Sequence, residues 1–172
     1  MYLEERYDRS MTLIVILVVA IALFGIAFVT RRRFGILGLA LASGVVLAQS
    51  ATSYVGDFLE QQGLPVAPLS YNDTATIILI MIPSFILLAG GPTYSSKKMA
   101  LVGAFGYALL GTFFLLGPLT TALPTDDPSV RNVLVKIAQS QDLIVIIALV
   151  LALIDTFMVH GSAGRRHKSS KH

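Results

Sequence analysis

Long stretches of this chain contain no charged residue, and this feature restricts the folds that the chain can adopt. An α-helix needs about 20 apolar residues to cross the hydrocarbon core of a bilayer. Only 13% of the 172 residues are charged, about half the share found in ordinary soluble domains. So few charges cannot cover the surface of a soluble fold. The sequence therefore predicts an all-α, polytopic membrane helix bundle. Its five transmembrane helices are expected at residues 11–30, 34–55, 74–91, 99–123 and 143–159.

The chain is predicted to form a single transmembrane domain, residues 11–160, between two short tails. The tail at residues 1–10 carries three acids and two arginines. Those acids, and a first apolar run of 20 residues, do not suit a cleaved signal peptide. We therefore expect the first helix to be retained. The other tail, residues 161–172, is basic.

Joining five helices separates the charges onto two sides. Nine of the thirteen basic residues fall on one side with no acid among them: Arg31, Arg32, Arg33, Lys97, Lys98, Arg165, Arg166, Lys168 and Lys171. The opposite side holds nine of the ten acids: Glu4, Glu5, Asp8, Asp57, Glu60, Asp73, Asp126, Asp127 and Asp142. Positive charge is retained in the cytoplasm. The N-terminus is therefore predicted outside and the C-terminus inside, in the cytoplasmic (inner) membrane.

Two stretches outside the apolar segments also carry a pattern. Residues 129–139 place apolar side chains at helical spacing, which predicts a short amphipathic helix on the outer membrane surface. The alternative is a helix packed against the other outer loop. In the basic tail, Arg165, Arg166, Lys168 and Lys171 are expected to bind an anionic inner leaflet, at about 1 kcal/mol per basic residue. We expect the bilayer, and not nucleic acid, to be their partner.

Small residues gather in the second and fourth segments. Helices in a membrane associate by close backbone approach, which needs small side chains about four residues apart. The predicted helix-packing positions are Gly38, Ala40, Gly44, Ala48, Gly103, Ala104, Ala108 and Gly111. The first and third segments are bulky, which suits contact with lipid. This pattern predicts association with further copies of the chain or with a membrane-complex partner.

A basic turn followed by a helix rich in small residues, GIAFVTRRRFGILGLALASGVVLAQSATSYVGDFL at residues 25–59, resembles the start of the colicin V production (CvpA) family. The later stretch KKMALVGAFGYALLG resembles that family's second half, so the likeness covers roughly residues 11–123. The family usually has four helices, and this chain is predicted to have five. The resemblance implies an inner-membrane protein linked to export or envelope maintenance.

Asp155 is the only acid within a predicted span. A carboxylate in hydrocarbon is costly, so it needs a partner. One interpretation is a structural ion pair or hydrogen bond at the inner boundary, where Arg31, Arg32, Arg33, Lys97 and Lys98 are the candidate charge partners. A second is a protonatable site on an ion or substrate path. A third is that the helix ends earlier and leaves Asp155 in water.

Gln49 is the second candidate polar site within a span. It is expected either to hydrogen-bond across a helix interface or to line a polar pocket. Pro83 and Ser84 lie mid-span in the third segment, where a kink or a broken helix with an ion site is predicted.

Signatures of catalysis are missing from the sequence. It has no HExxH, G-x-S-x-G, Walker A or G-x-G-x-x-G motif, and it has no Cys. No catalytic residue, metal site or cofactor is predicted. The first hypothesis is a non-enzymatic scaffold or accessory subunit that associates through its small-residue helices. The alternative is a small oligomeric channel or transporter that uses Asp155 as its ionisable site.

Overall fold

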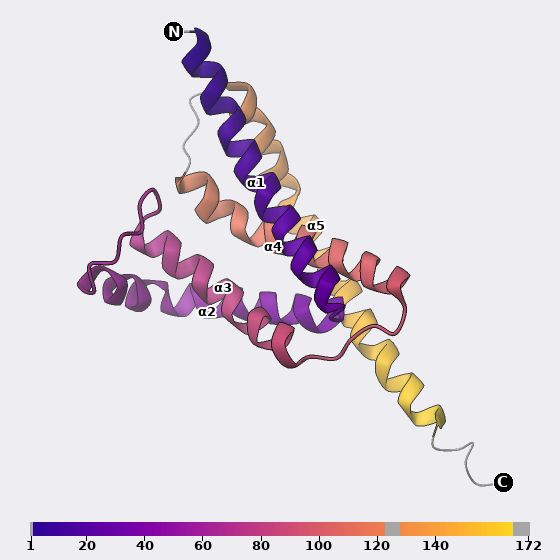
Figure 1. The fold of residues 1–172 in the computed structure, drawn as a ribbon. Helices are drawn as coiled ribbons and strands as arrows, with labels where there is room; N and C mark the ends of the chain where they lie inside the picture. Colours follow the sequence, from indigo (N-terminus) through magenta and orange to yellow (C-terminus); the bar gives the residue numbers. More distant parts are fainter. Residues whose placement is uncertain (1, 123–127, 167–172) are drawn as a thin grey trace, which may run out of the picture.

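A computed structural model describes residues 2–122 and 128–166, and these residues form five α-helices (Figure 1). The helices are α1 (Tyr2–Thr30), α2 (Phe34–Gln61), α3 (Tyr71–Gly90), α4 (Lys97–Ala122) and α5 (Pro128–Arg166). Each contains a segment long and apolar enough to cross a membrane. The predicted all-α membrane bundle is confirmed, and the chain is a multi-pass integral membrane protein.

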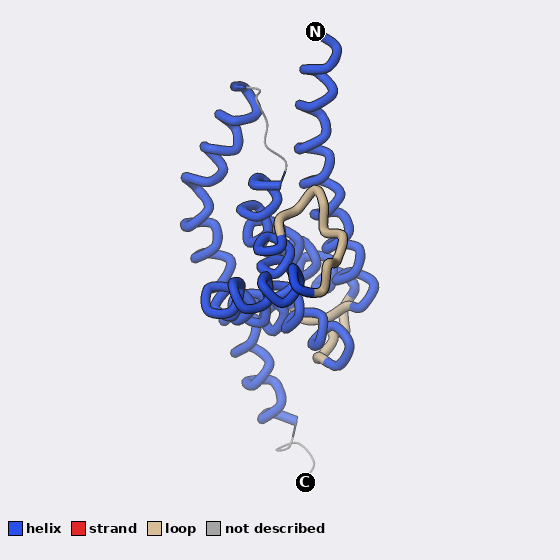
Figure 2. The backbone as a smooth tube through the Cα atoms, turned by 90° about the vertical axis from the view of Figure 1, so that its left-hand side faces the viewer, coloured by secondary structure: helices blue, strands red, loops and turns tan. Residues whose placement is uncertain are grey.

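The helices pack as two pairs, and α5 lies against one helix of each pair. The most extensive contact joins α2 to α3, and the next joins α1 to α4. α5 packs mainly against α2, and its last turns extend beyond the other helices (Figures 1 and 2). The centre of the bundle contains fully buried side chains from three helices, among them Leu41 of α2, Ser84 of α3 and Tyr107 of α4.

Prolines do not interrupt the helices that contain them. α3 continues through Pro83, so the predicted broken helix is wrong at this position. Ser84 donates to the carbonyl of Met81 at 3.1 Å and shares a hydrogen bond of 2.9 Å with the hydroxyl of Tyr107. The polar group beside the proline is therefore satisfied within the bundle. α4 likewise continues through Pro118.

Several helices are longer than the apolar runs within them. α1 begins at Tyr2, so most of the predicted N-terminal tail is helical. α2 continues to Gln61, and the chain turns at Gly63, whose φ of 62° lies in the left-handed region that glycine adopts without strain.

The predicted separate helix at residues 129–139 is wrong in one respect. The segment is helical, but it forms the first part of α5 and is continuous with the fifth span. The physical reason is local, because no glycine or proline occurs between Ser129 and Gly161 to end the helix. The apolar run at 143–159 is therefore the middle of a helix of 39 residues.

Candidate functional site

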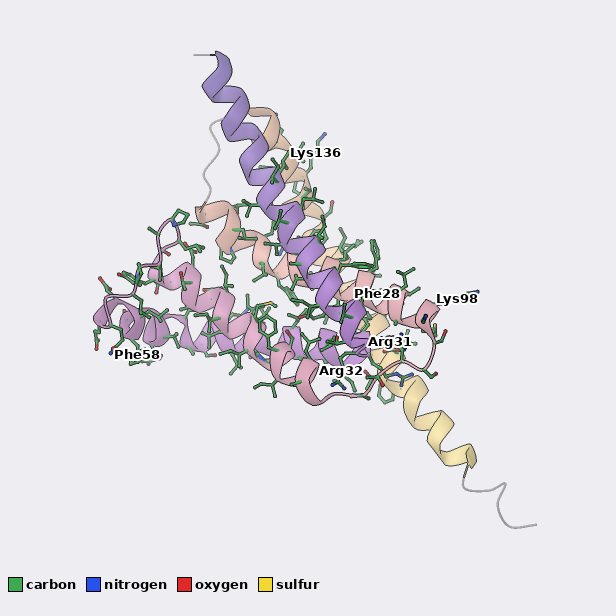
Figure 3. The ribbon with its side chains drawn as sticks, viewed as in Figure 1. Phe28, Arg31, Arg32, Phe58, Lys98 and Lys136 are labelled. Atoms are coloured by element: carbon green, nitrogen blue, oxygen red, sulfur yellow. The ribbon has the colours of Figure 1, made fainter. Side chains whose placement is uncertain are left out.

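The turn between α1 and α2 meets the turn between α3 and α4, and together with Asp155 these turns form what we call the hairpin junction (residues 31–35, 91–94 and 155). The amide of Arg33 donates to the carbonyl of Pro92 at 3.1 Å, and the amide of Tyr94 donates to the carbonyl of Arg31 at 2.8 Å. Arg31, Arg32 and Lys98 lie at the same end of the bundle, far from Phe58 (Figure 3). The two basic turns are thus held together by backbone hydrogen bonds.

Asp155 reaches the hairpin junction from α5. Its Oδ2 accepts hydrogen bonds from the amide of Gly35 at 2.9 Å and from the hydroxyl of Tyr94 at 3.0 Å. The Tyr94 hydroxyl in turn accepts from the amide of Phe34 at 3.2 Å. Arg33, the residue at the N-cap position of α2, makes no capping bond with its side chain. Asp155 therefore caps α2 from another helix, and its negative charge lies at the positive end of the α2 dipole.

Gly35 allows Asp155 to come this close. A Cβ at Gly35 would lie 2.5 Å from both the carbonyl oxygen of Ala152 and Oγ1 of Thr156. These are contacts that real Cβ atoms do not make, so any larger residue would push α2 away from α5. Gly35 was not among the predicted helix-packing positions, although it begins the same run of small residues that contains Gly38.

The five predicted charge partners of Asp155 have other roles in the described structure. Arg32 donates from Nε to the carbonyl of Leu88 and from a terminal nitrogen to that of Ala89, each at 2.8 Å, and so caps the C-terminus of α3. Arg33 places its guanidinium carbon 5.3 Å from the centre of the Tyr94 ring. Arg31, Lys97 and Lys98 are exposed. Within the described residues, Asp155 therefore accepts hydrogen bonds from a backbone amide and a phenol, and from no basic side chain.

Tyr94 is the residue that links both turns to Asp155. It lies in the connection between α3 and α4 and is 8% exposed. Burial raises the pKa of Tyr94 to about 12, and the neighbouring Asp155 contributes in the same direction. The phenol is therefore neutral at physiological pH and keeps the proton that it donates to the carboxylate. No pattern in the sequence connects Tyr94 with Asp155, because the two residues are 61 positions apart.

A groove between α4 and α5 ends at the hairpin junction. It has a volume of about 510 Å³, and we call it the α4–α5 groove. One end contains Tyr94 and Asp155, which are its only hydrogen-bonding side chains. The remainder is apolar and is lined by Phe34, Met99, Val102, Gly103, Phe105, Gly106, Leu109, Ile144, Ile147, Ala148, Leu151 and Ile154.

Gln49 lies in a different cavity. This cavity, of about 520 Å³, is lined partly by Gln49, Thr52, Thr76, Gln141 and Asp142. Asp142 and Asp155 are thirteen residues apart on α5, or about 20 Å at 1.5 Å per residue. The structure therefore does not bring the two candidate polar sites, Gln49 and Asp155, together.

The predicted helix-packing residues of α2 are buried within the chain. Gly44 meets the backbone of Ile80, and Gly38 lies close to Ala152, where an added Cβ would be 3.1 Å from the Ala152 Cβ. Ala40 and Ala48 are also buried.

The predicted helix-packing residues of α4 are buried in the same way. A Cβ at Gly103 would contact the Tyr94 ring, and one at Gly111 would lie 2.8 Å from Leu23. Ala104 and Ala108 are 1% and 6% exposed. All eight small residues are thus buried within one chain.

The basic tail is only partly described. Arg165 and Arg166 belong to the last turn of α5. Lys168 and Lys171 lie outside the described residues. Among the residues that the structure describes, no group of three or more His, Cys, Asp or Glu is placed to hold a metal ion.

The fold and this site define a multi-pass α-helical membrane protein whose helices are joined at one end by a hydrogen-bonded junction. Comparison of the chain with protein families, with curated proteins and with solved structures gave no match. The resemblance to the colicin V production family stays a prediction from the sequence.

Proposed function

We propose that the chain is a non-enzymatic scaffold or accessory subunit of the inner membrane, acting in export or envelope maintenance. The observation that supports this most is the use of Asp155 as a cap. Its Oδ2 accepts from the amide of Gly35, the second residue of α2, and from the Tyr94 hydroxyl. A carboxylate held in this way stabilises a fixed arrangement of helices, as a scaffold requires.

The outer faces of the bundle support association with other membrane components. Large apolar side chains of α1 and α5 are more than half exposed, including Ile21 at 61%, Val29 at 79% and Ile146 at 61%. The small residues are buried within the chain, so a partner would contact these bulkier faces instead. A further copy of the chain or another membrane protein is the proposed partner.

Disulfide cross-linking tests association directly, because the chain has no native Cys. Ile21→Cys and Val29→Cys each add a single thiol on an exposed face. For self-association, disulfide-linked dimers are expected when the oxidant is added to native membranes. They are not expected when the protein is diluted into excess lipid before the oxidant is added. A partner protein would give a cross-linked product of higher mass that includes that partner. Monomer at both positions, in membranes and in detergent, would refute association through α1, and the same result for Ile146→Cys would refute association through α5.

The second candidate function is an oligomeric channel or transporter with Asp155 as its ionisable site. The observation in its favour is that the α4–α5 groove reaches Asp155. Liposome flux through the wild-type chain separates the two functions. A scaffold gives none, whereas a transporter gives flux that Asp155→Asn abolishes, because an amide cannot exchange the proton. Flux that survives Asp155→Asn would exclude that role of Asp155.

A further inference from the structure

The length of the α4–α5 groove matches one leaflet of a bilayer. Along α5 it extends from Ile144 to Asp155, which is eleven residues or about 16 Å at 1.5 Å per residue. Half of a hydrocarbon core is about 15 Å thick. An acyl chain with its headgroup at Asp155 would therefore extend along the groove to Ile144 and reach the centre of the bilayer there.

One oxygen of Asp155 is available at the polar end of this groove. Both hydrogen bonds to the carboxylate are made by Oδ2. Oδ1 has no hydrogen-bond partner in the described part of the chain. It is not one of the fully buried polar atoms that lack a partner, so it is accessible. Tyr94, in contrast, already uses its hydroxyl as donor and acceptor. The groove therefore offers a ligand one charged acceptor and no vacant donor.

Basic side chains flank the same end. Lys97 and Lys98 are exposed and begin α4, and the next residue, Met99, lines the groove. A headgroup at this end of the groove would meet the carboxylate of Asp155, and Lys97 and Lys98 precede Met99 directly on α4. This arrangement complements a zwitterion that carries a phosphate and an N–H donor cation.

We propose that the α4–α5 groove binds one acyl chain of a phosphatidylethanolamine-type lipid, with its primary ammonium on Oδ1 of Asp155 and its phosphate beside Lys97 and Lys98. An anionic lipid such as phosphatidylglycerol brings no cation to Asp155. Phosphatidylcholine brings a cation without an N–H donor. A helix of a second copy would fill the apolar part and leave the carboxylate unused. This proposal does not depend on the scaffold function.

The test is native mass spectrometry of the full chain in detergent, titrated with phosphatidylethanolamine, phosphatidylcholine or phosphatidylglycerol of identical acyl chains. The wild type is expected to retain one phosphatidylethanolamine at least about tenfold more tightly than either other lipid, as a charged hydrogen bond provides. Asp155→Asn is expected to lose this preference, since it removes the charge and keeps an acceptor for Gly35.

Two neighbouring residues of α5 give a matched pair of variants. Ile147 lines the groove and is 52% exposed, whereas Ile146 lies outside it and is 61% exposed. Ile147→Trp is expected to displace the bound lipid, and Ile146→Trp is expected to retain it. This pair decides whether the groove is occupied even if Asp155→Asn does not fold.

Three results would overturn the proposal. One is equal retention of all three lipids by the wild type. Another is unchanged retention in Ile147→Trp, which would place the lipid elsewhere. The third is a dimer that Ile147→Trp disperses while no lipid is bound, which would assign the groove to a second copy.

Discussion

Gly44 gives the most direct test of how α2 and α3 are packed. A Cβ at this position would lie 2.7 Å from the Cα of Ile80 and 2.8 Å from its carbonyl carbon, whereas ordinary contact begins at 3.4 Å. The carbonyl oxygen of Ile80 lies nearer still, so the helices must separate by at least about 0.7 Å to accept Gly44→Ala. Backbone atoms cannot rotate away as a side chain can. Overpacking of this kind costs about 1–3 kcal/mol.

Gly25 in α1 is the matched control, because a Cβ there meets nothing within 4 Å. Both substitutions gain the same helix propensity, about 1 kcal/mol, so this gain cancels in the comparison. Gly25→Ala is expected to exceed Gly44→Ala in free energy of unfolding by the overpacking cost of about 1–3 kcal/mol.

SDS titration of the detergent-solubilised protein measures this difference. The chain has six Tyr and no Trp, so the tyrosine signal in near-ultraviolet circular dichroism reports the loss of packing. Equal midpoints for the two variants would refute the close approach of α2 to α3. A normal midpoint for Gly44→Ala together with dispersed oligomers would instead place Gly44 between copies of the chain.

Three further predictions concern side chains that form hydrogen bonds within the bundle. Tyr107→Phe removes the buried bond to Ser84 and is expected to lower the SDS unfolding free energy by about 1 kcal/mol. Arg32→Gln removes the cap of α3, costs up to about 1 kcal/mol, and should increase proteolysis of the turn at residues 91–96. Phenolate absorbance is titrated against pH in the wild type and in Tyr94→Phe. The difference between the two curves, which is the signal of Tyr94, should appear near pH 12 and not near 10.0. Since this pKa is raised on folding, the stability linked to it is complete below pH 10.0 and falls as the pH approaches 12. If Tyr94→Phe loses as much stability as the wild type between pH 10.0 and 12, the pH dependence does not come from Tyr94.

Hydropathy and charge were sufficient to predict the helices, because each crossing must satisfy its backbone internally over a fixed length. They also grouped the basic turns, and Arg31 and Lys98 indeed lie at one end of the bundle (Figure 3). The separate helix at 129–139 was wrong because amphipathic and apolar patterns can follow one another on one continuous helix. Only a helix-ending residue separates such patterns, and this segment contains none.

The spacing of small residues predicted close helix packing, but it could not predict which helix each residue meets. A glycine row on α2 fits a helix of the same chain and a helix of another copy equally well. The structure places Ile80 of α3 against Gly44 and Leu23 of α1 against Gly111. Such pairings depend on the order and crossing of all five helices, which no local pattern records.

The cap on α2 could not be predicted because a capping residue normally adjoins its helix in sequence. At the N-cap position stands Arg33, and the acceptor comes from Asp155, 120 residues after the Gly35 amide that it binds. The isolated acid within a span therefore predicted a charged partner, whereas the structure pairs it with the N-terminus of α2, which has no side-chain cap of its own. Two opposite charges serve helix ends here, since Arg32 binds the C-terminal carbonyls of α3.

The two carboxylate oxygens of Asp155 point to two separable roles. Oδ2 stabilises the fold by accepting from Gly35 and Tyr94, and an amide oxygen can accept the same two bonds. Oδ1 faces the proposed lipid headgroup, where the charge itself is needed. Asp155→Asn should therefore keep most of the SDS unfolding free energy while losing the preference for phosphatidylethanolamine, and Asp155→Ala should lose both. If Asp155→Asn unfolds as readily as Asp155→Ala, the cap needs a charge on Oδ2, and the two roles are one.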